Sequence, residues 1–140
     1  MSLGDKQMKI AVCIEKSGGM LFNNRRVSKD SILQQKLLEC VGEGNICLNE
    51  YSAKQFTNTE HLQVSDDFLT VASDDDICFI ENVEIPTDKV TQVYLFQWNR
   101  DYPADTYFDY NLKELGFKKV RSEDFAGSSH KKITLEVYQR

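Results

Sequence analysis

The chain has 140 residues, of which 41% are hydrophobic and 28% are charged, and its formal net charge is −5. This balance predicts a folded globular chain, and no apolar run approaches the roughly 20 residues of a membrane-spanning helix. The overall negative charge disfavours non-specific binding to nucleic acid. Most acidic side chains lie in residues 60–109, whereas residues 113–140 are net basic, so a local basic surface remains available for a phosphate.

The ends and the cysteines of the chain restrict its class further. Residues 1–7 resemble a leader or an expression remnant, so we expect residues 8–140 to form a single globular domain. The N-terminus lacks the pattern of a secretory signal, which predicts a cytoplasmic protein. The four cysteines include no CxxC pair, and the two histidines, His61 and His130, lie far apart. We therefore predict no disulfide framework and no metal site built from cysteine and histidine.

The first half of the chain alternates strands and helices. Residues 8–15 form the first predicted strand, because they are apolar, rich in β-branched side chains and followed by a polar turn. A helix is expected next, with Ser28 or Asp30 as its N-cap, an apolar stripe along one face and an end at Gly42 or shortly after it. Residues 45–52 form the second predicted strand.

The second half is richer in strands. Strands are predicted at residues 76–82, 90–98 and 131–139. Residues 106–116 indicate a helix that contributes aromatic and leucine contacts to the core and ends at Gly116. Residues 118–125 are expected to be extended.

This order of elements predicts an α/β or α+β fold. A mixed central sheet of about five to six strands should carry the helices packed on it. Residues 131–139 alternate between apolar and polar side chains, which is typical of antiparallel pairing near the end of the chain. Polar segments follow several of the predicted strands, and three of them are candidates for a site.

The first candidate segment is residues 18–30, which join the first strand to the first helix. Arg25 and Arg26 lie just before the predicted start of that helix, where guanidinium groups and free N–H groups suit an anion. Alternatively, both arginines pair with acidic residues of the strongly negative region 60–109. The glycine pair in this segment is not a P-loop, because GxxxxGK[ST] is absent.

The second candidate segment is residues 98–105, at the end of the strongest predicted strand. We predict that Asn99 and Arg100 bind a ligand and that Asp101 and Asp105 either act as acid and base or bind a divalent cation. Alternatively, the segment is a stiffened turn whose polar groups satisfy the backbone, and its last aspartate caps the following helix.

The third candidate segment is residues 125–133. Ser128 or Ser129, together with His130 and an aspartate of the second segment, is a candidate nucleophile, base and orienting group. Adjacent residues on a strand face opposite ways, so we favour His130 as a phosphate donor or general acid beside Lys131. Alternatively, the histidine lies on the surface and simply begins a strand.

Four stretches carry a resemblance over nearly the whole chain from about residue 8: FNNRRVSKD, YSAKQF, FQWNRDYPAD and GSSHKKITLEVY. They resemble an uncharacterised family of small bacterial proteins, some of which are labelled ribonuclease Z. The HxHxDH metal motif of that enzyme is absent, and two histidines do not build its two-metal site. The resemblance therefore implies no catalytic residues.

Two hypotheses of function follow. The first is a protein that binds a phosphate or another anion, on a nucleotide, a phosphorylated metabolite or an RNA end, and that acts on it as a hydrolase. We expect Arg25, Arg100 and His130 to converge on one cleft in that case. The second is a non-enzymatic interaction module, with homo-oligomers allowed, that uses its acidic region and its aromatic side chains as a partner surface. The sequence identifies no cofactor.

Overall fold

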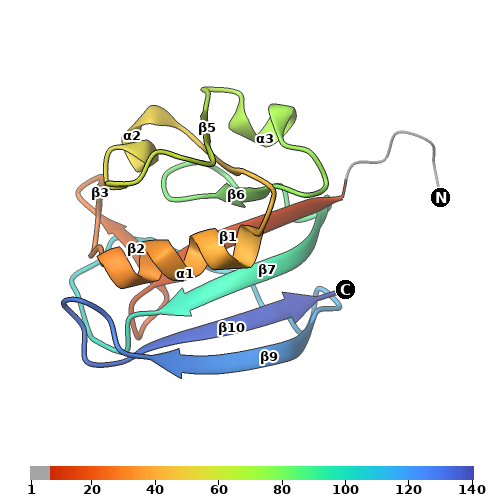
Figure 1. Cartoon of the computed structure of the whole chain (residues 1–140). Coiled ribbons are helices and arrows are strands. Elements are labelled where there is room, and N and C mark those ends of the chain that lie inside the picture. Colours follow the sequence, from red (N-terminus) through yellow and green to blue (C-terminus); the bar gives the residue numbers. More distant parts are fainter. Residues whose placement is uncertain (1–6) are drawn as a thin grey trace.

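A computed structural model describes residues 7–140, so most of the predicted leader, residues 1–6, lies outside the described residues. A seven-stranded sheet forms the centre of the molecule (Figure 1). Its strands are β1 (Met8–Ile14), β4 (Ile46–Leu48), β5 (Leu62–Val64), β6 (Ile77–Phe79), β7 (Val90–Gln97), β9 (Lys118–Phe125) and β10 (Ile133–Gln139). A small second sheet consists of β2 (Gly19–Phe22), β3 (Arg25–Arg26) and β8 (Thr106–Tyr107). The helices are α1 (Ser31–Val41), α2 (Glu50–Ala53) and α3 (Phe68–Val71).

The large sheet is mixed, with the order β5-β4-β6-β1-β7-β10-β9. Its first five strands in this order are parallel, and β10 is antiparallel to both β7 and β9. The predicted α/β fold with a mixed central sheet is therefore confirmed, including the antiparallel pairing near the end of the chain. The sheet has seven strands rather than five or six, partly because the three-residue stretch β5 pairs with β4 at one edge.

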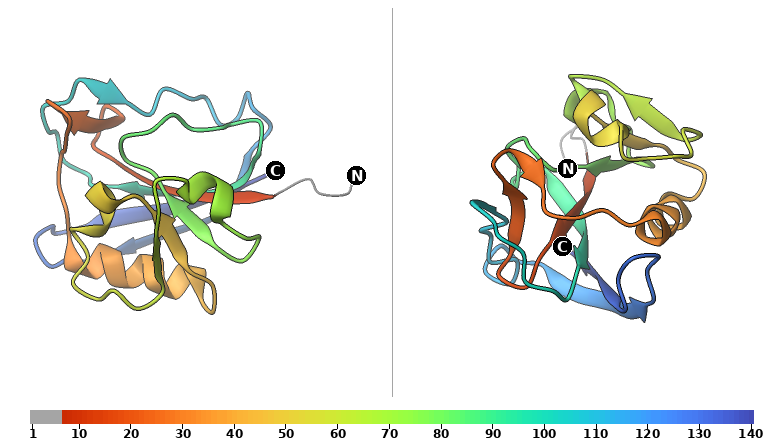
Figure 2. Two further views of the ribbon diagram at one scale, coloured as in Figure 1. Left: turned by 90° about the horizontal axis from the view of Figure 1, so that it is seen from above. Right: turned by 90° about the vertical axis from the view of Figure 1, so that its left-hand side faces the viewer.

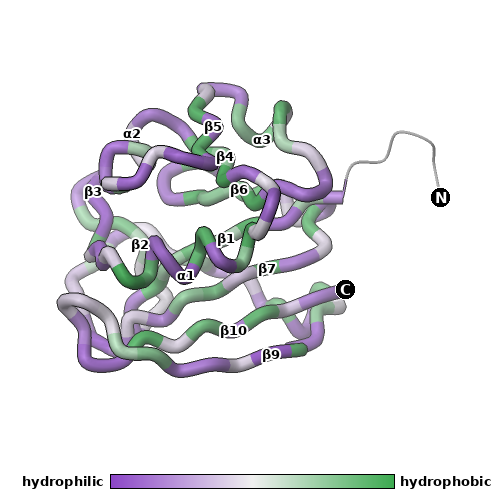
Figure 3. The backbone as a smooth tube through the Cα atoms, in the orientation of Figure 1, coloured by the Kyte–Doolittle hydropathy of each residue, from purple (hydrophilic) through white to green (hydrophobic). Residues whose placement is uncertain are grey.

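The two faces of the sheet carry separate apolar cores. Helix α1 covers one face, where it packs with residues such as Ala11 and Phe96. The small sheet and residues 108–117 lie on the other face, over residues such as Ile10 and Val12 (Figure 2). The hydropathy of the residues follows this arrangement, since β1 is mainly hydrophobic, β10 alternates between hydrophobic and polar residues, and the edge strand β9 is mainly hydrophilic (Figure 3). A charged edge strand resists pairing with another sheet.

The predicted helix over residues 106–116 is wrong. This segment begins with β8, which pairs with the distant strand β2, and continues as turns. The threonine and aromatic side chains at its start favour extended backbone. Asn111 then accepts a hydrogen bond from the Glu114 N–H, and Gly116 has a φ of +92°. Asp105 therefore caps no helix; its carboxylate accepts a hydrogen bond from the Asn23 N–H at 3.0 Å.

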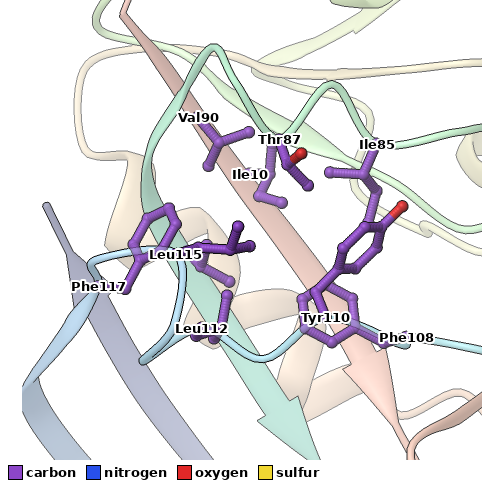
Figure 4. Close-up of a pocket in the computed structure, with 10 residues that line it drawn as sticks. Ile10, Ile85, Thr87, Val90, Phe108, Tyr110, Leu112, Leu115 and Phe117 are labelled. Carbon is purple, nitrogen blue, oxygen red and sulfur yellow. The ribbon is translucent and has the colours of Figure 1, made fainter.

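Residues 108–117 close one apolar core and leave little space inside it. A cavity of about 10 Å³ lies between this segment and the sheet, lined by side chains such as Ile10, Val90, Leu112 and Phe117 (Figure 4). A space of this size holds at most a water molecule. The cavity is a packing gap rather than a ligand site.

Helix α1 is the longest helix in residues 7–140, and it begins close to the candidate site. Asp30 is its N-cap, and the Asp30 carboxylate accepts hydrogen bonds from the N–H groups of Ile32 and Leu33. Gly42 ends the helix with a φ of +61°. The prediction of this helix and of Asp30 as one of two candidate caps is confirmed. Across residues 7–140, the structure has no helix with the length and apolar character needed to cross a membrane.

We predict that Leu37→Ala lowers the free energy of unfolding by about 2–5 kcal/mol, because Leu37 is fully buried in the middle of α1 and its loss leaves a cavity. The exposed Gln35 on the same helix is the control, and Gln35→Ala should change this free energy by less than about 0.5 kcal/mol. Urea denaturation of both variants measures the difference. Equal effects would contradict the packing of α1 described above.

Candidate functional site

The three candidate segments meet at one end of the large sheet. Strands β1 and β7 end there and β10 begins there, at the left of Figure 1. The loop before α1, the loop after β7 and the loop before β10 therefore lie close together. In open α/β sheets, ligands bind at the carboxyl ends of the parallel strands.

A buried pair of side chains, one histidine and one aspartate, forms the centre of this region. The His130 Nδ1 lies 2.9 Å from the Asp30 Oδ2, and the two residues are 5% and 3% exposed. Asp30 comes from the start of α1, and His130 comes from the loop before β10, 100 residues later. This contact fixes the position of the histidine ring.

The environment of Asp30 keeps its carboxylate ionised. Burial alone would raise the pKa of Asp30, but hydrogen bonds, led by the Ser129 N–H and the His130 ring, hold this pKa well below its ordinary value. An ionised carboxylate only accepts hydrogen bonds. The proton between the two groups is therefore on the His130 Nδ1. In the neutral imidazole, the His130 Nε2 then carries the lone pair and is the acceptor.

Two hydroxyl groups face that acceptor. The Ser28 Oγ lies 2.9 Å from the His130 Nε2, and the Tyr102 OH lies 3.0 Å from it. Ser28 follows the small strand β3, and Tyr102 belongs to the loop after β7. Asp30, His130 and Ser28 thus form a continuous hydrogen-bonded chain from a buried carboxylate to a hydroxyl group.

Trp98 forms one wall of this cluster. Its ring stacks on the His130 ring, with a centroid separation of 4.5 Å and an interplanar angle of 28°. Trp98 is 2% exposed, and its indole N–H has no acceptor among the described residues. The tryptophan therefore limits how the histidine ring can rotate and shields it from water.

The loop before β10 wraps around the Asp30 carboxylate. The Ser128 N–H donates to the Asp30 Oδ1 at 3.0 Å, and the Ser129 N–H donates to the Asp30 Oδ2 at 2.9 Å. The Ser129 Oγ lies 3.2 Å from the His130 Nδ1, which is possible because this loop is not an extended strand. A side chain at Gly127 would begin 2.4 Å from the Asp30 Oδ2, so only glycine fits there.

Arg26 is held by an internal ion pair. Its guanidinium group donates to both carboxylate oxygens of Glu81, at 3.0 and 3.3 Å, and Glu81 is 9% exposed. It also lies over the Tyr51 ring, 4.5 Å from the centroid. The alternative predicted from the sequence, pairing with an acidic residue of region 60–109, thus applies to Arg26.

Arg25 differs from its neighbour. It is exposed, and within residues 7–140 its side chain has no acidic partner. Two adjoining clefts, of about 550 and 400 Å³, share Arg25 and Arg26 as lining residues. Tyr102 lines the larger cleft, and Ser28 and Lys29 line the smaller one.

The other predicted site residues lie around this centre without entering the clefts. The Asn99 side chain donates to the Lys132 carbonyl oxygen and the Thr134 Oγ1, which ties the end of β7 to β10. Arg100 and Asp101 are exposed, and their side chains have no partner in the part of the chain that the structure describes. Lys131 is exposed as well.

Histidine, cysteine, aspartate and glutamate side chains form no group of three or more in residues 7–140 that could hold a metal ion. The sequence pattern around Ser28 indicates only a helix cap, and the pattern around Tyr102 indicates no role in the site. No local pattern marks either residue, because Ser28 and Tyr102 contact His130 across 102 and 28 positions of the sequence.

The fold and the site define an α/β protein with a polar cluster and two clefts at the carboxyl ends of its parallel strands. No protein-family model matches the sequence, and no curated protein matches it. Among solved structures, it is similar to dihydrofolate reductase from Enterococcus faecalis complexed with NADP(H) and RAB-propyl, with a TM-score of 0.63. The match covers 95% of this chain and 96% of that chain at 10% sequence identity. The chain therefore has the fold of that enzyme, and the likeness extends to the fold alone.

We predict that Asp30 makes the stability of the protein depend on pH in the acid range. Because the pKa of Asp30 is lower in the folded protein, its contribution is present above the ordinary aspartate pKa of about 3.9 and is lost as the pH falls below it. Asp30→Asn should lower the free energy of unfolding at pH 7 by at least about 1 kcal/mol and reduce its fall between about pH 5 and pH 3. Urea denaturation over this pH range measures both effects.

The control for this prediction is Asp101→Asn, which changes an exposed aspartate without a side-chain partner in residues 7–140. This variant should keep the pH dependence of the unmodified protein. A pH dependence that is the same for Asp30→Asn and the unmodified protein would contradict the electrostatic role assigned to Asp30.

Proposed function

We propose that the protein binds a small ligand through a phosphate or another anionic group in the two clefts beside β3. One observation carries this proposal: Arg25 is shared by both clefts and has no acidic partner in the described chain, although Arg26 beside it is neutralised by Glu81. A guanidinium group binds phosphate or carboxylate through paired hydrogen bonds.

The surroundings of Arg25 support the same class of ligand. Lys29 adds a second positive charge to the smaller cleft, and Tyr51 and Tyr102 add aromatic walls. The cleft volumes of about 550 and 400 Å³ lie in the range that small-molecule sites occupy. A nucleotide, a phosphorylated metabolite or the end of an RNA strand would each present a suitable anion and a body to pack against these rings.

The structurally similar dihydrofolate reductase adds one ligand to this group. That enzyme was solved with NADP(H), a phosphate-bearing cofactor. NADP(H) therefore belongs in a ligand panel for this chain, beside inorganic phosphate, a nucleoside monophosphate and a sugar phosphate. NADP(H) is included for two reasons: the shared fold and the cationic side chains of the clefts.

The surface proposed for an interaction module is less complete than the sequence suggested. Trp98 was expected to contribute to a partner surface, but it is 2% exposed and packs against His130. Among the exposed hydrophobic residues, Phe22 and Tyr107 lie on the paired strands β2 and β8, whereas Val120 lies on β9 in the other sheet. We therefore develop the ligand-binding proposal alone.

We predict that Arg25→Gln weakens binding of an anionic ligand about tenfold or more, because it removes a charged hydrogen-bond donor from both clefts. A thermal-shift screen with the panel above identifies a ligand, and isothermal titration calorimetry then gives the dissociation constants of the variants. The weakening should diminish at high salt, because the interaction is partly ionic and exposed.

Arg100→Gln is the charge-matched control, because it also removes one exposed arginine but lies outside the lining of both clefts. It should leave the dissociation constant within about twofold of the unmodified protein, a change of less than about 0.5 kcal/mol. An equal loss in both variants would attribute binding to net charge rather than to the clefts. A panel without any ligand that stabilises the protein would also contradict the proposal.

A further inference from the structure

We propose that Ser28 is a nucleophile activated by His130 and oriented through Asp30, and that it cleaves carboxylic esters that carry an anionic group. The ester class rests on the proposed function, because Arg25 and Lys29 would bind the anionic group. The reactivity of Ser28 itself does not depend on that anion.

The distances along the chain of side chains fit this role. The Ser28 Oγ lies 2.9 Å from the His130 Nε2, and the His130 Nδ1 lies 2.9 Å from the Asp30 Oδ2. Both separations lie in the hydrogen-bonding range in which a base accepts the proton of a nucleophile and a carboxylate orients the base. This arrangement is defined by geometry and recurs on unrelated folds, so the fold does not argue against it.

Burial decreases from Asp30 to His130 to Ser28, as a nucleophile that meets the ligand requires. The Asp30 and His130 side chains are 0% and 2% exposed, whereas Ser28 is half-buried and lines the cleft of about 400 Å³. The Asp30 carboxylate is therefore shielded from water, and the imidazole ring can meet a ligand or a water molecule only at the Nε2 edge, where the Ser28 hydroxyl group lies. Within residues 7–140, the backbone N–H groups of Ser28 and Lys29 have no acceptor, which leaves them free to donate to a developing oxyanion.

The competing hydroxyl groups are less suited to act as the nucleophile. Ser129 contacts the His130 Nδ1, whose proton is directed to Asp30, and not the free lone pair on Nε2. Tyr102 does reach Nε2, but it lines the other cleft, whose lining does not include Lys29. Ser28 alone combines contact with Nε2 and a place beside both Arg25 and Lys29.

The reaction divides into two steps. In the first, the Ser28 Oγ forms a bond to the ester carbonyl carbon while its proton passes to the His130 Nε2, and this proton then leaves with the alcohol as the C–O bond breaks. In the second, water attacks the acyl group on Ser28, gives its proton to Nε2 and releases the acid, and the proton returns to the Ser28 Oγ. The sum is hydrolysis of one ester by one water molecule, with His130 as general base and then general acid.

A fluorophosphonate probe tests the nucleophile without an anionic substrate. We expect one adduct on the unmodified protein by intact-mass spectrometry, located to Ser28 by peptide mapping. Ser28→Ala should abolish this adduct, and His130→Gln should slow its formation at least a hundredfold. Ser122→Ala, which removes an exposed hydroxyl group on β9, is the control and should label at the unmodified rate.

Tyr102→Phe separates the two hydroxyl groups that share the histidine. It should still give the adduct at Ser28, because Ser28 then becomes the single hydroxyl partner of Nε2. An adduct at residue 102, or at any serine other than Ser28, would overturn the proposal. So would the absence of an adduct on an unmodified protein that melts cooperatively.

Ser28→Cys provides a second test that withstands a folding defect in the other variants. A thiol paired with His130 should be alkylated by iodoacetamide near neutral pH faster than the native cysteines, because burial raises the pKa of Cys13 and Cys40. His130→Gln in the same background should slow the alkylation at position 28 at least tenfold. An unchanged rate would show that the histidine does not activate this position.

Two esters distinguish the nucleophile from the anion site. The unmodified protein should hydrolyse the para-nitrophenyl monoester of succinic acid with a higher kcat/KM than para-nitrophenyl acetate, which carries no anion. Arg25→Gln should lower kcat/KM for the succinate ester about tenfold more than for the acetate, whereas Arg100→Gln, outside both clefts, should leave the ratio of the two values as in the unmodified protein. If Ser28 is labelled but the two esters have equal kcat/KM, Ser28 is still a nucleophile, and the anion site is not its substrate pocket.

Discussion

The contact between Asp30 and His130 holds the functional end of the molecule together. Asp30 caps α1 through its Oδ1 and holds the loop before β10 through both carboxylate oxygens, so one side chain joins elements that are 100 residues apart. Burial of an aspartate is costly unless its charge is satisfied, and here amide and imidazole donors satisfy it. The position of the histidine ring, and therefore of everything that contacts its other nitrogen, follows from this carboxylate.

The buried Glu81 carboxylate gives the adjacent Arg25 and Arg26 different roles, because it pairs with Arg26 only. Because successive side chains of a strand face opposite ways, Arg26 turns toward Glu81 while Arg25 remains at the surface. The ion pair of Arg26 fixes β3 against the rest of the chain. Arg25 is then held on a strand instead of a mobile loop, which places its positive charge at a defined point between the clefts.

The sequence predicted most of the architecture because its signals are local. The apolar run of β1, the Asp30 cap of α1 and the alternation of β10 each depend on a few neighbouring residues. The segment 106–116 was mistaken for a helix because its pairing with β2 depends on residues far away in the sequence. Tertiary pairing of this kind overrides local propensity.

The same distinction explains what could be learned of the site. Segments around Arg25, Trp98 and His130 were recognised as candidates, because polar residues after apolar strands are a local pattern. The sequence offered Ser28 and Asp30 as two candidates for one cap, and only the folded chain shows that Asp30 caps α1 while Ser28 contacts His130. No spacing rule connects residues that lie 100 or more positions apart in the sequence, with most of the sheet between them.

The shared nitrogen of His130 joins the two clefts chemically. A neutral Nε2 has one lone pair, and the Ser28 and Tyr102 hydroxyl groups both lie within hydrogen-bonding distance of it. A molecule in the larger cleft that accepts a hydrogen bond from the Tyr102 hydroxyl group would leave the Nε2 lone pair to Ser28, which lines the smaller cleft. The occupancy of one cleft would then decide which hydroxyl group contacts Nε2, without any movement of the backbone.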